Sequence, residues 1–171
     1  MRYCVQMLVT ALCGLLLAGC PCVEPTELEG TWVEQGTPPG ETALIAFRGH
    51  DWRTVTRSSS SYLGPSVALT MVVIYEGELV LDMTRDPKWI DLTATGGDIE
   101  AEYDPSQVTD TQVAQLEQLL SFARDLQEVQ FGKTQLGLYR IENGTLTMAF
   151  GQATGERPAD LASNTVTYTG P

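Results

Sequence analysis

The chain has 171 residues, with 22 acidic against 10 basic side chains and a formal net charge of −12 at pH 7. Such a surface repels phosphate backbones and anionic headgroups, so we expect no nucleic-acid partner and no electrostatic attraction to a membrane. The length suits one domain that buries a real core without metal ions or disulfide bridges.

The first residues have the order of a secretory signal. Arg2 gives the positive start, Met7–Leu17 the apolar core, and Ala18 with Gly19 the small residues of a cleavage site. The apolar run is shorter than the ~20 residues that a membrane-spanning helix needs. The pattern therefore predicts a signal peptide over residues 1–19.

The end of this run reads Leu17-Ala18-Gly19-Cys20, which resembles the lipobox of bacterial lipoprotein signal peptides. The resemblance implies that the Cys20 thiol receives a diacylglyceryl group and that cleavage makes Cys20 the first residue of the mature chain. It places the protein in the cell envelope, anchored on the extracytoplasmic side of a membrane. Several acyl chains on one residue would make this attachment effectively permanent.

Cleavage decides what the cysteines can do. Cys4 and Cys13 leave with the signal, and a lipidated Cys20 has no thiol to offer Cys22, so we expect no intrachain disulfide. Cys22 is then either without a role, or a site of intermolecular pairing or second acylation.

Residues 20–28 contain two prolines and no periodicity, which predicts a tether. Fully extended, residues 21–28 reach no more than about 26 Å. The folded domain is expected over residues 29–171, close to its membrane.

Most of this domain has the pattern of short strands separated by turn residues. Asn143-Gly144 is the strongest hairpin signal, Ser58–Ser61 is expected to be a loop, and Glu76-Gly77 inside one long apolar run predicts either a bulge or a tight turn. This arrangement favours a small antiparallel β-barrel, closed or half-open, or a sandwich. The predicted strands are 31–35, 42–48, 52–57, 67–82, 89–94, 136–142, 145–150 and 165–169.

One segment departs from the strand pattern. Between Thr109 and Val129 the apolar residues follow helical spacing, Thr109 with Gln112 forms a capping box, and Gly132 is a plausible stop. We predict one amphipathic helix within an insertion over residues 96–132. Its apolar face should cover either the barrel mouth or an outer sheet face that carries Trp89.

Ordered sequence blocks resemble a lipocalin-like domain family of bacteria for which no function is established. The first block contains Gly30-Thr31-Trp32 and the last contains Arg157; the helical insertion and the Ser58–Pro65 loop depart from the family. The resemblance implies a lipocalin-like barrel in which the Arg157 guanidinium stacks on Trp32 as a structural pair. The blocks are Leu28-Glu29-Gly30-Thr31-Trp32, Gly77-Glu78-Leu79-Val80-Leu81-Asp82, Pro87-Lys88-Trp89-Ile90-Asp91-Leu92, Gly137-Leu138-Tyr139-Arg140-Ile141 and Gly155-Glu156-Arg157-Pro158.

The residues that could carry chemistry form no constellation. His50 lies in a predicted turn beside Asp51, without a nucleophile motif nearby, so no catalytic residue and no enzyme activity are expected. Neither Asp82, Asp86 and Asp91 nor Asp104 and Asp110 have the spacing of a calcium loop, and one histidine with one usable thiol makes zinc improbable. We expect no metal and no cofactor.

Arg140 alternates with Tyr139 and Ile141, so its side chain points either into the barrel toward a ligand or outward to the acidic surface.

Two functions remain open. The first is a non-catalytic module that holds a small apolar ligand inside the barrel, because barrels of this size contain either side chains or one such ligand. The second is a structural or interaction module with a solid core, whose outer face or helix binds an envelope protein. Core packing by residues such as Leu44, Phe47, Val55 and Phe150 would favour the second, and a cavity beneath the helix would favour the first.

Overall fold

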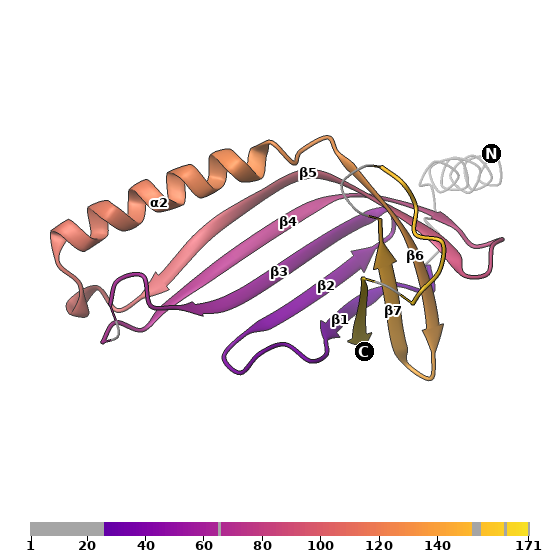
Figure 1. Ribbon diagram of the computed structural model, residues 1–171, viewed down its shortest axis with the longest axis horizontal. Helices are drawn as coiled ribbons and strands as arrows, with labels where there is room; N and C mark the ends of the chain where they lie inside the picture. Colours follow the sequence, from indigo (N-terminus) through magenta and orange to yellow (C-terminus); the bar gives the residue numbers. More distant parts are fainter. Residues whose placement is uncertain (1–25, 65, 152–154, 163, 171) are drawn as a thin grey trace, which may run out of the picture.

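The computed structural model describes residues 26–64, 66–151, 155–162 and 164–170. They form a closed antiparallel barrel in which each strand pairs with the next and β1 pairs with β8 (Figure 1). This confirms the predicted all-β barrel with one inserted helix. The strands are β1 (Gly30–Glu34), β2 (Thr42–Arg48), β3 (Asp51–Ser60), β4 (Leu69–Asp82), β5 (Lys88–Tyr103), β6 (Thr134–Glu142), β7 (Thr145–Phe150) and β8 (Thr165–Thr169), and the helices are the 3₁₀ turn η1 (Pro105–Gln107) and α2 (Asp110–Glu128).

The strongest local signals are confirmed. The Thr109 hydroxyl accepts from the Gln112 backbone N–H, and the Gln112 side chain accepts from the Thr109 backbone N–H, so the predicted capping box begins α2. Asn143 and Gly144 both have positive φ, 52° and 74°, as a two-residue hairpin turn requires.

Strands β3 and β5 are longer than the sequence pattern predicted, whereas β4 begins at Leu69, two residues after the predicted start. Ser58–Ser60 belongs to β3 instead of a loop, and β4 is a single strand with a bulge between Glu76 and Gly77. β5 continues to Tyr103, so residues 96–103, which lie within the predicted insertion, are strand. Gly97 explains why the strand continues. A Cβ at this position would lie 2.2 Å from the Ile74 carbonyl oxygen, so only glycine lets β4 and β5 approach this closely. Glycine inside a strand usually weakens it, but here it permits the pairing.

These long strands extend beyond the barrel, and α2 lies along them (Figure 1). Among the described residues, β6 pairs with β5 only over Lys88–Thr93, so the rest of β5 lies beyond the pairing with β6. A second hydrophobic cluster joins α2 to β4 and β5. Its most buried members include Leu69, Ile99, Leu116 and Leu120.

Two polar side chains of α2 complete this contact. Arg124 donates to the Ile99 carbonyl at 2.7 Å and to the Asp98 carboxylate at 3.0 Å, and Gln127, which is buried, donates to the Ile74 carbonyl at 2.5 Å. The helix therefore covers the β4–β5 extension and not the face that carries Trp89.

Apolar side chains fill part of the barrel interior. Trp32 is 4% exposed, its indole N–H donates to the Leu28 carbonyl at 2.7 Å, and a Cβ on Gly170 would lie 2.6 Å from its ring. Leu28 is fully buried and Glu27 forms an ion pair with Lys88 at 2.6 Å, so the predicted tether ends before residue 27.

Within the described residues, both hydrophobic clusters lie between residues 28 and 168. In the described part of the chain, no helix combines the length and the apolar character needed to cross a membrane.

The predicted stacking of Arg157 on Trp32 is wrong. The Arg157 guanidinium carbon lies 4.3 Å from the centroid of the Trp89 ring, and its N–H groups donate to Asp91 at 2.5 Å and to the Gly137 carbonyl. The physical reason is strand alternation: Ile90 and Leu92 are buried inside, so Trp89 and Asp91 point outward, where the β7–β8 connection crosses them. Trp32 points inward instead.

We expect Arg157→Ala to lower the free energy of unfolding by about 2 kcal/mol, because it removes a cation–π contact and a partly buried, charge-assisted hydrogen-bond set. Arg85→Ala is the matched control. Arg85 lies over the same Trp89 ring at 4.7 Å, but its side chain is 57% exposed, so its loss should cost well under 1 kcal/mol. Urea unfolding measures both variants, and equal losses would contradict this assignment.

Gly170→Ala should destabilise the domain by roughly 1–3 kcal/mol, because the added methyl would overlap the fixed Trp32 ring. Gly96→Ala is the control, since its Cβ would meet only the flexible Glu76 side chain at 3.3 Å. Thermal unfolding should separate the two variants, and similar melting temperatures would show that the ring is free to move.

Candidate functional site

A cavity of about 500 Å³ lies inside the barrel. Interior-facing side chains of seven strands line it, together with two residues of the connection between α2 and β6. This volume falls within the ordinary range of small-molecule sites, and an eight-stranded barrel is wide enough for one small ligand. The lining residues are Ile45, Trp52, Thr54, Tyr75, Leu92, Ala94, Gln130, Lys133, Gln135, Met148, Phe150, Val166 and Tyr168.

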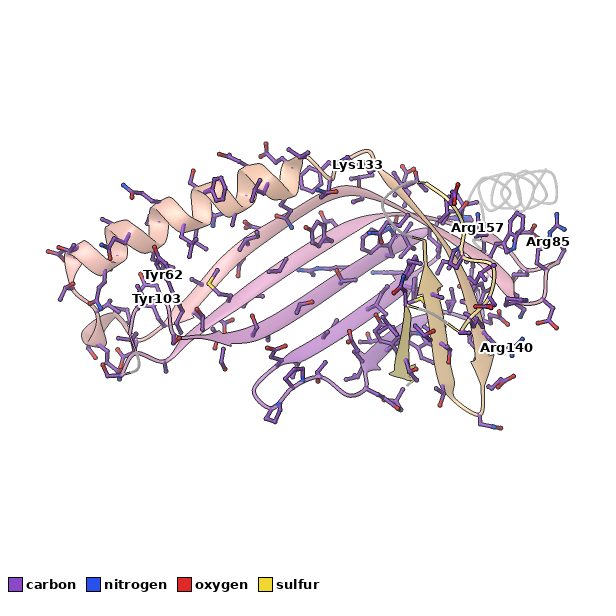
Figure 2. All side chains as sticks on the ribbon, in the orientation of Figure 1. Tyr62, Arg85, Tyr103, Lys133, Arg140 and Arg157 are labelled. Carbon is purple, nitrogen blue, oxygen red and sulfur yellow. The ribbon has the colours of Figure 1, made fainter. Side chains whose placement is uncertain are left out.

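The cavity has an apolar interior and a polar rim. Ile45, Leu92 and Met148 are buried, 5% exposed or less, whereas Gln130 and Lys133 are exposed. The rim residues follow α2, so the cavity opens beside the C-terminal end of the helix; Figure 2 shows Lys133 at this end, where the chain turns from α2 toward β6. An elongated molecule could therefore bury an apolar part and keep a polar end at the rim.

Two aromatic residues of the wall carry polar groups. The Trp52 indole N–H donates to the Glu78 carbonyl at 3.0 Å, which holds the ring in place. Burial, with a smaller contribution from the Glu34 carboxylate, raises the pKa of Tyr168 to about 12. The Tyr168 phenol is therefore protonated at neutral pH and can donate a hydrogen bond.

A second hollow of about 460 Å³ lies on the outer surface. Ala46 and Trp52 line it together with two cations, Arg48 and Arg53, and two carboxylates, Asp51 and Glu76. The internal cavity has only one charged side chain among its lining residues, so it is the better candidate site for an apolar ligand.

The structure separates the titratable residues that the sequence singled out. His50 is exposed in the β2–β3 turn. Asp82 accepts from Thr84 at 2.5 Å, and this hydrogen bond lowers its pKa. Asp86 pairs with Arg140 at 3.3 Å, and Asp91 pairs with Arg157.

These contacts show that the aspartates share no common centre. Among the described residues, no group of three or more His, Cys, Asp or Glu side chains is arranged to hold a metal ion. Arg140 points outward, because it pairs with Asp86 and lies 3.7 Å from Glu142.

The remaining predicted sites lie apart from the cavity or outside the described residues. Trp32 and Arg157 are structural, on the inside and the outside of the barrel wall, and neither lines the cavity. Cys20 lies outside the described residues, as do the predicted signal peptide over residues 1–19 and most of the predicted tether.

Sequence analysis missed the rim residues Gln130, Lys133 and Gln135. In the sequence, Gln130 and Lys133 look like the polar end of a helix around the Gly132 stop, and Gln135 lies just before the predicted strand 136–142. Their convergence depends on two backbone hydrogen bonds that tie the connection to β5: Gly132 N–H to the Ala94 carbonyl at 2.7 Å, and Ala94 N–H to the Lys133 carbonyl at 3.4 Å.

The comparisons with known proteins give no family for this chain: no protein-family model matches it, and no curated protein does.

Proposed function

We propose that this protein is a lipid-anchored envelope lipoprotein, attached through Cys20 on the extracytoplasmic side of a membrane. Its barrel serves as a non-catalytic module that binds a small, largely apolar ligand. The anchor is supported by the Leu17-Ala18-Gly19-Cys20 sequence at the end of a short apolar run.

The observation that carries the ligand proposal is the cavity of about 500 Å³ inside the barrel. Large side chains fill another part of the interior: Leu28, Phe47 and Tyr139 are each 2% exposed or less. The side chains around the cavity leave their part of the interior open. An apolar molecule entering the cavity would remove the partly exposed surface of Tyr75 and Phe150 from water, which stabilises binding by ~25 cal/mol per Å² of apolar area.

One observation favours the alternative, an interaction module. Phe122, Leu126 and Val129 of the α2 region are each at least 54% exposed, and their spacing places them on one face of the helix. An envelope protein that binds α2 would cover this stripe.

The anchor is tested with two neighbouring cysteines as a matched pair. Cys20→Ser should abolish incorporation of labelled fatty acid and move the protein out of the membrane fraction, because the acceptor thiol is lost. Cys22→Ser should leave both unchanged. Lipid incorporation that survives Cys20→Ser, or is lost in Cys22→Ser, would contradict the assigned acylation site.

The ligand proposal is tested with a soluble form, residues 21–171, since the core lies within the described domain. Native mass spectrometry of this form, purified from its own host, should show a co-purifying small molecule. Ala94→Phe should reduce its occupancy several-fold by filling the cavity, whereas Val80→Phe on the outer face should not.

A clean apo mass, together with no binding of decanol in solution, would reject the ligand proposal and favour the interaction module.

A further inference from the structure

We infer that the ligand of this cavity is an amphiphile with an apolar tail and an anionic head group, and that Lys133 at the rim binds the head. This inference rests on the proposed function, because it names the class of molecule that the cavity would take.

The first support is the charge inside the cavity. None of its thirteen lining residues is aspartate or glutamate, although the chain contains 22 acidic residues. Lys133 is the one charged side chain in the lining, so the rim is locally positive on an otherwise acidic protein. This pattern favours an anionic head over a cationic one.

The second support is that Lys133 is free to bind. Among the described residues, Lys133 forms no ion pair, and neither do Arg48 and Arg53, which line the outer hollow beside Asp51 and Glu76 instead of the cavity. The described contact of Lys133 Nζ is a long hydrogen bond to Gln130 Oε1, at 3.5 Å. A lysine left unpaired on a surface rich in carboxylates is therefore available to an incoming anion.

The third support is the arrangement of the other rim groups. The side-chain amides of Gln130 and Gln135 line the same rim, and each can donate hydrogen bonds to a carboxylate or phosphate oxygen. The backbone bonds between Ala94 and residues 132–133 hold this rim at the end of β5. The apolar wall of Trp52, Leu92 and Met148 lies within the same cavity, so one molecule can contact both.

A structural role for Lys133 is the competing explanation, because cations near a helix C-terminus interact favourably with the helix dipole. That role would make Lys133 matter for stability and not for the choice of head group. The two explanations therefore differ in which measurement a substitution changes.

The test compares four probes with the same ten-carbon tail: decanoate, decyl phosphate, decanol and decylamine. Binding to the soluble form is followed by tryptophan fluorescence at low salt, since Trp52 lines the cavity. The two anions should bind about fivefold more tightly than decanol, and decylamine should bind more weakly than decanol. Both anionic heads share the chemistry that Lys133 recognises, and their relative affinity distinguishes a carboxylate from a phosphate source.

Lys133→Gln should remove the anion advantage and leave decanol affinity and unfolding unchanged. Arg53→Gln is the matched control, because Arg53 is an exposed cation outside the cavity and should keep the advantage. Equal binding of decanol and decanoate to the unmodified protein, or an advantage that survives Lys133→Gln, would overturn the inference about the head group. Failure of all four probes to bind would instead reject the proposed ligand-binding function.

Discussion

The length of β5 constrains most of this structure. β5 spans Lys88–Tyr103, but its pairing with β6 ends at Thr93, so the rest of the strand extends past the barrel without β6 beside it. Unpaired strand edges and bare apolar faces are unfavourable in water, because the backbone groups and the apolar side chains both lack partners. Helix α2 supplies partners of both kinds. Leu116 and Leu120 cover the apolar face of the β4–β5 extension, and Arg124 donates a hydrogen bond to the Ile99 carbonyl. The inserted helix is thus a consequence of the long ladder between β4 and β5.

The packing of α2 along β4 and β5 also determines where the rim of the candidate site lies. The chain leaves α2 at Glu128 and must enter β6 at Thr134, beside the point where the β5–β6 ladder begins. Hydrogen bonds to Ala94 hold this short connection against β5, which places Gln130 and Lys133 at the rim of the interior cavity. Changes in the packing of α2 would therefore alter the rim before they altered the apolar wall. Residues 129–133 alone connect the helix to β6, so they link the position of α2 to the rim of the cavity.

Local signals in the sequence predicted local structure well, and the errors came from contacts between distant segments. The Thr109 capping box and the Asn143-Gly144 turn depend on neighbouring residues alone, and both are present. The end of β5 was missed because Gly96-Gly97 resembles a strand break, whereas Gly97 permits a close approach of Ile74 from β4.

The same distinction applies to the candidate site. Arg157 was assigned to the wrong tryptophan because the assignment came from the family resemblance. Its contact with Trp89 depends on the path of the β7–β8 connection, which is a tertiary feature. The cavity rim was invisible for a related reason, since its polar residues converge only when the barrel closes. The pattern of short strands could predict a barrel, but it could not predict how much of the interior the side chains fill.

The barrel must offset the packing that is lost at its cavity. A cavity forfeits packing energy, at a cost that rises with its volume, so the remaining contacts must hold the fold. Here the indole N–H of Trp32 satisfies the buried Leu28 carbonyl, and Arg157 ties Asp91 and the Gly137 carbonyl of β6 together on the outside. These contacts lie apart from the cavity lining. Trp52 and Leu92 belong both to the core and to the cavity wall, so contacts away from the lining help to hold the barrel where the wall leaves a space.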